Sequence, residues 1–141
     1  MGVYTLIDNA DPILKEKTEA FNFNDPQIPP EQLASMLADT MCLENGIGLA
    51  APQVGINLSV FVIGDPSNKE GVMAMFNPKI VDTFGDMVYY MEGCLSFPGL
   101  YVKIKRPAGV RVRFTDMYGR TTTTKYSGMT ARSIQHEYDH L

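Results

Sequence analysis

The apolar and polar positions divide the chain into a helix, a run of strands and a second helix. Between residues 30 and 45, apolar side chains recur every three or four positions. This spacing predicts an amphipathic helix that begins at Pro30 and ends at Asn45-Gly46. Beyond the glycine-rich stretch after this helix, short apolar or alternating runs predict strands. These runs are residues 59–63, 72–76, 80–88, 101–105, 110–114 and 121–125.

The clearest alternation lies in residues 110–114, where valine and phenylalanine alternate with arginine. Because successive side chains of a strand point to opposite faces, this pattern predicts one buried and one charged face. Tyr118-Gly119 predicts a hairpin turn, and a closing helix is expected from about Met129 to the end of the sequence. We predict an α+β fold, with mostly antiparallel small sheets packed around a C-terminal helix, in one domain of residues 1–141.

Composition places the chain among ordinary globular proteins. Of its 141 residues, 45% are hydrophobic and 20% are charged, and residues 1–29 predict a mostly irregular arm. The net charge of −4 gives no support for binding to nucleic acid or anionic membranes. No apolar run reaches membrane-spanning length, and no secretion signal is recognisable. We therefore expect reduced cysteines in a cytoplasm-like compartment, with Cys42 buried in the stripe of the first helix.

The glycine-rich stretch, residues 46–55, imitates a dinucleotide-binding fingerprint in the order of its glycines. That fingerprint follows a strand and opens a helix. Here a helix is expected before the stretch, and Pro52 interrupts the segment where the second helix would begin. We therefore interpret it as a tight loop whose glycines let another backbone or a ligand approach closely.

The last seven residues, QHEYDHL, hold the only two histidines of the chain in the pattern His-Glu-x-x-His. On a helix, His136 and His140 share one face and can bind one metal ion. Glu137 lies one position round the helix and can reach a water molecule beside that ion. The alternative is a short amphipathic helix with two half-buried histidines.

Catalytic metal sites usually have three protein ligands and an open position for water. In the common zinc proteases with this motif, the third ligand lies downstream of the second histidine. Only Leu141 follows His140, so a third ligand must come from earlier in the chain. Cys94 is the leading candidate, because a thiolate binds zinc or ferrous iron strongly. The alternative is an inert buried cysteine.

Three segments of the chain resemble the signature motifs of peptide deformylases. They are GIGLAAPQ at residues 46–53, EGCLS at residues 92–96 and QHEYDHL at residues 135–141. Their order and approximate spacing also match, and the likeness extends over nearly the whole chain. Members of this family usually continue well past the third motif, so the expected domain lacks the usual C-terminal extension. The family reaction removes the N-formyl group from the starting methionine of new polypeptides and releases formate.

The resemblance implies that Cys94, His136 and His140 hold one divalent metal ion. It also implies that Glu137 acts as a general base and then as a general acid. The family favours Fe2+ as the physiological ion, and the ligand types also accept Zn2+, Ni2+ or Co2+.

The same resemblance implies that Gln53 and the backbone N–H of Leu95 bind the oxyanion formed during the reaction. For Gln53 the alternative is a bond to loop backbone groups only. Among the remaining family positions, Ile47, Tyr90 and Met129 correspond to the methionine pocket, although each could equally belong to the core. The backbone of Gly48 would lie beside the substrate. Arg106 matches an arginine that supports the site by pairing near Glu92.

The implied partners are N-formylmethionyl peptides and nascent chains. We expect a monomer in the cytoplasm, or in the equivalent compartment of a bacterial host or organelle. The family assigns ribosome docking to the C-terminal tail, so ribosome association is left open, and no binding to nucleic acid or membranes is expected. Two rival functions are a metal-dependent peptidase or amidase of other specificity and a non-enzymatic binder of N-terminal methionine peptides. The Cys94 motif argues against the first, and intact Glu137, Gln53 and Cys94 argue against the second.

Overall fold

The computed structural model describes residues 17–94 and 97–141, and the side chains of residues 90–102 fall outside the description. None of the helices in this part of the chain is long and apolar enough to cross a membrane. The elements are α1 (Pro30–Leu43), β1 (Gly48–Ala50), the 3-10 helix η2 (Ala51–Val54), β2 (Val60–Ile63), the 3-10 helix η3 (Lys69–Gly71), β3 (Met73–Cys94), β4 (Phe97–Thr115), β5 (Thr121–Ser127) and α2 (Gly128–Tyr138).

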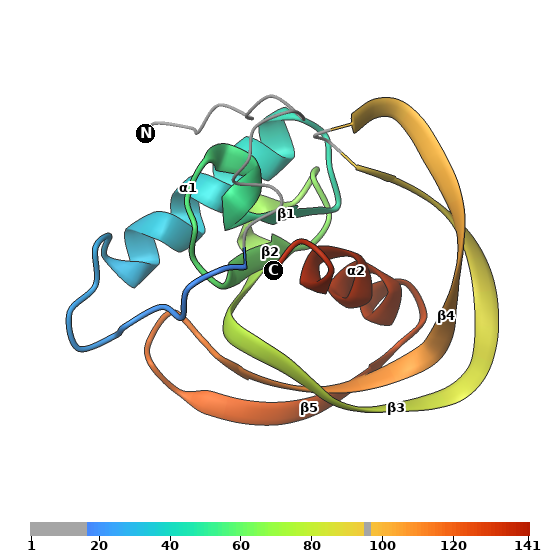
Figure 1. Cartoon of the computed structure of the whole chain (residues 1–141). Coiled ribbons are helices and arrows are strands. Elements are labelled where there is room, and N and C mark those ends of the chain that lie inside the picture. Colours follow the sequence, from blue (N-terminus) through green and yellow to red (C-terminus); the bar gives the residue numbers. More distant parts are fainter. Residues whose placement is uncertain (1–16, 95–96) are drawn as a thin grey trace.

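The five strands form a single antiparallel sheet in the order β1-β2-β3-β4-β5. Figure 1 shows β3, β4 and β5 curving around α2, while α1 lies beside β1 and β2. The predicted α+β class is confirmed. The expected small sheets are instead continuous, because the long strands β3 and β4 join the short strands β1 and β2 to the edge strand β5.

The two faces of this sheet bury different helices. One cluster places Leu33, Leu37 and Met41 of α1 against Val60 and other sheet residues. Cys42 is half-buried and packs against this cluster as a free thiol, close to the buried position that was predicted.

The second cluster joins α2 to the inner side of β4. Ala131 and Ile134 of α2 pack with Val110, Val112 and Phe114. The predicted alternation of residues 110–114 is confirmed, since these three side chains are buried and the intervening arginines are exposed. Each fully buried aliphatic side chain of this kind contributes roughly 1.5–3 kcal/mol of burial energy.

The sequence predicted two strands, 72–76 and 80–88, where the structure has the single strand β3. Asn77-Pro78 does not end the strand, because Asn77 adopts a positive φ of 51° and a bulge absorbs the extra residue. The side chain of Asn77 also holds the N-terminal arm, accepting from the N–H of Phe21 at 2.7 Å and donating to its carbonyl at 2.9 Å. Similarly, 101–105 and 110–114 belong to one strand, β4, which continues through Pro107 opposite Met87.

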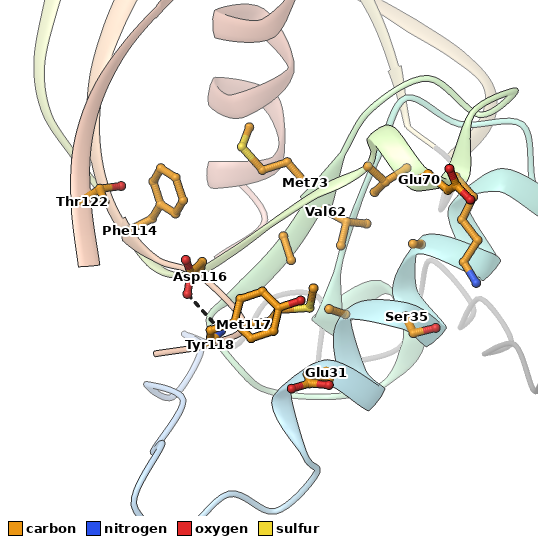
Figure 2. A pocket seen from close by; sticks show the side chains of 15 residues that line it. Glu31, Ser35, Val62, Glu70, Met73, Phe114, Asp116, Met117, Tyr118 and Thr122 are labelled. Atoms are coloured by element: carbon orange, nitrogen blue, oxygen red, sulfur yellow. Dashed lines mark hydrogen bonds between the residues drawn. The ribbon is translucent and has the colours of Figure 1, made fainter. Parts of the chain in front are cut away.

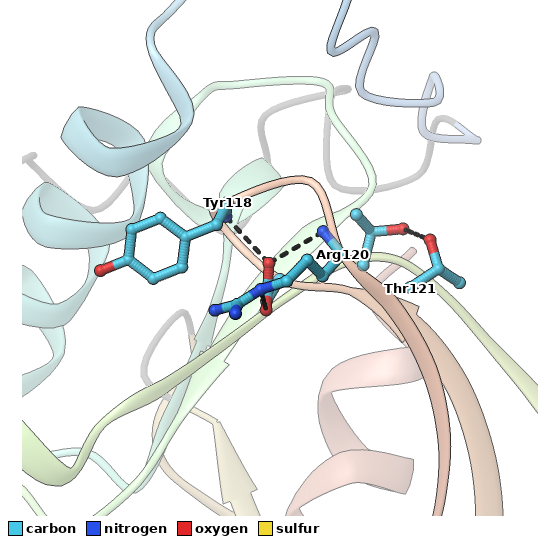
Figure 3. Close-up of polar contacts among 5 residues, drawn as sticks. Tyr118, Arg120 and Thr121 are labelled. Carbon is cyan, nitrogen blue, oxygen red and sulfur yellow. Dashed lines mark hydrogen bonds and ion pairs between the residues drawn. The ribbon is translucent and has the colours of Figure 1, made fainter.

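The predicted hairpin turn at Tyr118-Gly119 is confirmed between β4 and β5. Gly119 has a φ of 82°, a conformation that glycine adopts without strain. The carboxylate of Asp116 accepts from the N–H of Tyr118 at 2.9 Å and from the N–H of Arg120 at 3.0 Å, and it pairs with the Arg120 side chain (Figure 3). This turn fixes the register in which β5 extends the sheet.

Candidate active site

Helix α2 is held against β4 by apolar packing and by two polar ties. The amide of Gln135 donates to the carbonyl of Pro107 at 3.0 Å. One turn later, the guanidinium of Arg106 donates to Asp139 at 2.9 Å, and Arg106 itself is buried. Since Arg106 and Pro107 are neighbours on β4, the C-terminal end of α2 is fixed to one point of the sheet.

The two histidines lie side by side at this end of α2. Their ring centroids are 5.3 Å apart, with an angle of 74° between the ring planes. The predicted helix reached the end of the sequence, whereas α2 ends at Tyr138. His140 nevertheless stays one turn from His136, because the N–H of His140 donates to the carbonyl of Glu137 at 3.1 Å and tightens the last turn.

The surroundings of His140 keep its imidazole neutral. Burial is the largest cause and the nearby charge of His136 is the second; together they lower the pKa of His140 from 6.5 to about 4, against an opposing effect of Asp139. A neutral imidazole has the free electron pair that a metal ligand needs. The ring is therefore in the metal-binding protonation state at neutral pH.

The carboxylate of Glu137 is buried against the backbone of β1, with 4% of the residue exposed. A Cβ built on Gly48 would lie 2.6 Å from Glu137 Oε2 and 2.9 Å from its Cδ. No side chain fits at Gly48 without displacing the acid. The glycine that the sequence marked for a close approach therefore places a backbone edge directly beside a buried acid.

Gln53 reaches the same region from η2 and is 2% exposed. Its Oε1 accepts from the N–H of Ala50 at 2.9 Å. Because that partner is a donor, the oxygen end of the amide is fixed toward the end of β1, and the NH2 end is the one that can donate elsewhere. The bond to the β1 backbone and a donor role for Gln53 are therefore compatible.

Several predicted residues fall where the structure does not describe side chains. Cys94 closes β3, with its backbone paired to Phe97, and its thiol is outside the description. The same applies to the side chains of Tyr90 and Glu92, and Leu95 lies outside the described residues altogether. Among the described side chains, no group of three or more His, Cys, Asp or Glu forms a metal site. The ligand role of Cys94 stays a prediction.

Ile47 and Met129, the other two pocket positions, are 45% and 61% exposed. That exposure excludes the alternative in which they belong to the core, and their place in a methionine pocket stays a prediction. Arg106 pairs with Asp139, while the expected partnership with Glu92 stays a prediction because that side chain is not described.

Asp139 is the residue of this region to which sequence reasoning gave no role. Its signal was present, because an acid in the last turn of a helix is disfavoured by the helix dipole and calls for a cation. Arg106 supplies that cation, but the separation of 33 positions hides the pairing in the sequence.

A separate cavity of about 680 Å³ lies between α1, the start of β3 and the β4–β5 hairpin. Figure 2 shows Glu31 and Ser35 of α1 on one side, with Phe114, Met117 and Tyr118 on the other. None of the predicted catalytic or ligand residues lines it. The chemistry of the two histidines and Glu137 therefore belongs to a different place in the fold.

The described residues fit a divalent metal ion. Two adjacent imidazoles, one of them held neutral, are good ligands for zinc or ferrous iron, and a buried carboxylate follows the first of them in the chain. Such a set, completed by one more ligand, is typical of hydrolytic metal centres.

Comparison with known proteins gives one consistent result. Residues 3–141 match the family model described as polypeptide deformylase. A peptide deformylase of Desulforudis audaxviator is 40% identical over 141 residues, covering all of this chain and 89% of its own length. The crystal structure of a peptide deformylase from Synechococcus elongatus in complex with actinonin is 38% identical with a TM-score of 0.90, over 98% of this chain and 75% of that one. The Thermotoga maritima peptide deformylase structure is 34% identical with a TM-score of 0.89, over 99% and 91%.

Proposed function

Because this chain belongs to the peptide deformylase family, we propose that it removes the N-formyl group from the N-terminal formyl-methionine of nascent polypeptides and releases formate. The observation that carries the proposal is the position of Glu137. It lies on α2 next to His136, and its buried carboxylate packs against the backbone of Gly48. We place the reaction in the compartment where such chains are made, the cytoplasm or its organellar equivalent.

His136, His140 and Cys94 would hold the metal ion, with Fe2+ as the physiological ion. When bound, a divalent ion supplies Lewis acidity that makes water a nucleophile near neutral pH. The neutral state of the His140 ring supports this assignment, because a protonated imidazole could not act as a ligand.

Glu137 carries the proton through the reaction. Its carboxylate accepts a proton from the attacking water as the new C–O bond forms at the formyl carbon. It then returns that proton to the amine nitrogen as the C–N bond breaks, which yields formate and a free N-terminus. Burial beside Gly48 supports this role, because it restricts the carboxylate to one position.

Gln53 and the backbone N–H of Leu95 would donate to the oxyanion that develops on the formyl oxygen. The fixed orientation of the Gln53 amide supports its role, since a preorganised donor needs no reorientation during the reaction. The Gly48 backbone would run beside the peptide, with Ile47, Tyr90 and Met129 around the methionine side chain. Glu92 and Arg106 would support the site from behind.

The test is formate release from formyl-Met peptides by wild type and Glu137→Ala, together with metal analysis of both. We expect the variant to keep its metal ion and to lose about a hundredfold to ten-thousandfold in turnover, because only the proton carrier is removed. Glu31→Ala, which removes an exposed acid of α1, is the matched control and should retain full turnover. Unchanged turnover in Glu137→Ala, or cleavage of the peptide bond instead of formate release by wild type, would contradict the proposal.

A further inference from the structure

The outer face of the sheet carries a row of cations that the site does not use. Helix α1 packs on this face at β1, β2 and the start of β3, and β3, β4 and β5 continue beyond it (Figure 1). Across the strands, Arg113 lies opposite Lys79, and Arg111 lies opposite both Lys125 and Asp82. We call this surface the basic outer face; its cations are Lys79, Lys103, Lys105, Arg111, Arg113 and Lys125, all exposed.

These six are half of the 12 lysine and arginine residues of a chain whose net charge is −4. Strand β4 contains no acidic residue, and β5 contains none either. Asp82 and Asp86 are the acids of β3 between residues 73 and 90. Most of the 16 acidic residues of the chain therefore lie elsewhere, and the average charge hides a positive surface.

Arg111, Arg113 and Lys125 have no carboxylate within 4.0 Å in the part of the chain that the structure describes. Residues two apart on a strand are about 7 Å apart, and paired strands are about 5 Å apart. These separations are shorter than the screening length of about 8 Å at physiological salt, so the potentials of these cations add. The face is thus a continuous positive surface that suits a polyanion.

Two aromatic rings lie among these cations. Tyr89 is 58% exposed, and the ammonium groups of Lys103 and Lys105 are 4.8 and 5.6 Å from its ring centroid. The Phe84 ring covers Gly109 so closely that a Cβ there would collide with it, and the Lys125 ammonium is 5.8 Å from its centroid. Each ring therefore has a lysine ammonium over it, and a base that stacks on the ring takes the place of that flexible ammonium, which can then contact a phosphate.

We propose that the basic outer face binds single-stranded RNA, with phosphates on the cations and bases on the rings of Phe84 and Tyr89. Sheets that bind single strands combine these two features, because every base has a stacking face and every nucleotide a phosphate. The choice of RNA as the polyanion rests on the proposed function, since nascent chains are substrates that form beside RNA.

An anionic membrane fits this face less well. Membrane-surface binding buries apolar side chains roughly 5–10 Å into the lipid boundary. The Phe84 ring lies against the Gly109 backbone instead of projecting from the sheet. An acidic protein partner would use the same cations but would not need exposed rings.

The test is binding of a fluorescent oligouridylate RNA to the full chain, followed by anisotropy over a series of salt concentrations. Each phosphate contact with a single strand contributes about 0.7 to the slope of log affinity against log salt. The variant Arg111→Gln/Arg113→Gln should therefore lose about 1.4 from the slope and about 25-fold in affinity near 0.1 M salt. The matched control is Lys17→Gln/Lys69→Gln, which makes the same change in net charge at exposed positions elsewhere and should bind like wild type.

Two single variants probe the details. Tyr89→Ser should weaken RNA binding about tenfold through lost stacking, without changing the salt slope. Asp82→Asn should tighten binding, because it removes the acid opposite Arg111. Formate release from a short formyl-Met peptide should be equal in all of these variants, so the result is independent of the deformylation assay.

Three outcomes overturn the proposal. The first is absence of RNA binding by wild type at about 50 mM salt, where phosphate contacts are strong. The second is equal weakening by the control variant, which would assign any binding to net charge alone. The third is binding of phosphatidylserine vesicles or polyglutamate as tight as that of RNA, with the same dependence on Arg111 and Arg113.

Discussion

The two faces of β4 differ although they belong to one strand. Toward α2 it presents Val110, Val112 and Phe114, which are buried, and toward solvent it presents Arg111 and Arg113, which are exposed. The inner side chains are fixed by packing on the helix that bears both histidines. The outer arginines are exposed, so burial does not fix their identity. The inner face therefore shows what the fold requires, and the outer face is free to carry a binding property.

The largest expected effect is the difference in how much a substitution on each face lowers the free energy of unfolding. Ile134→Ala removes a fully buried side chain from the packing of α2 on β4, and we expect it to lower the free energy of unfolding by about 2–5 kcal/mol. Arg113→Ala on the outer face should change it by less than about 0.5 kcal/mol. Urea unfolding measures both. Equal losses would show that the outer face also carries the fold.

The next effect tests whether the inner face sets the geometry of catalysis. Gly48→Ala places a methyl group where the Glu137 carboxylate lies, so the acid must move. Displacement of about 1 Å in a catalytic group can cost about a hundredfold, and we expect a loss of that size in kcat/KM. Gly71→Ala is the control, since the group it approaches is the far end of the Asn68 side chain in an exposed turn. Retained activity in Gly48→Ala would show that the close approach is not needed.

A smaller effect is expected at the tie between helix α2 and strand β4. Asp139→Asn weakens the pair with Arg106 that anchors the turn of His140, and groups that orient metal ligands typically contribute tenfold or more to metal affinity. We therefore expect about a tenfold loss in Zn2+ affinity, measured by competition with a chelator. Asp86→Asn removes an exposed acid of β3 and should leave affinity unchanged. Equal affinities would assign the pair to stability alone.

The smallest effect belongs to the hairpin that joins β4 to β5. Asp116→Ala removes two backbone hydrogen bonds and the Arg120 pair, and should cost about 1 kcal/mol in unfolding experiments. Folding lowers the pKa of Asp116 from 3.8, mainly through the N–H of Arg120. The ionised group therefore stabilises the fold above pH 3.8, and this contribution is lost as the pH falls through the lower folded-state pKa. The difference between wild type and variant should shrink there, while Asp116→Asn should lie between the two.

The sequence was informative where one local rule decides the outcome. Helical spacing from Pro30, alternation in residues 110–114 and the turn at Tyr118-Gly119 all depend on near neighbours, and each was confirmed. The spacing of the two histidines also placed their rings together.

Features that depend on distant residues were missed. Asn77-Pro78 is typical of a strand break, yet β3 continues through a bulge at this point, and the side chain of Asn77 bonds the backbone of Phe21, 56 residues away. Strand β1 is three residues long and has no alternation to detect; it exists because it pairs with β2. The pair of Arg106 and Asp139 likewise requires the curved sheet before the two groups can meet.

The bulges of β3 limit how the length of the paired strands β3 and β4 can change over evolution. From Phe84 to Met87, β3 contains one residue more than the paired segment of β4 from Pro107 to Gly109. Similar register shifts follow Phe76 and Ile80. Each step exchanges odd and even positions relative to the opposite strand. A single-residue deletion there would turn one arm of the hairpin over, bringing lysines inward and apolar side chains into water. Insertions or deletions of two residues would preserve the alternation. Changes in the length of β3 or β4 should therefore be tolerated in even numbers only.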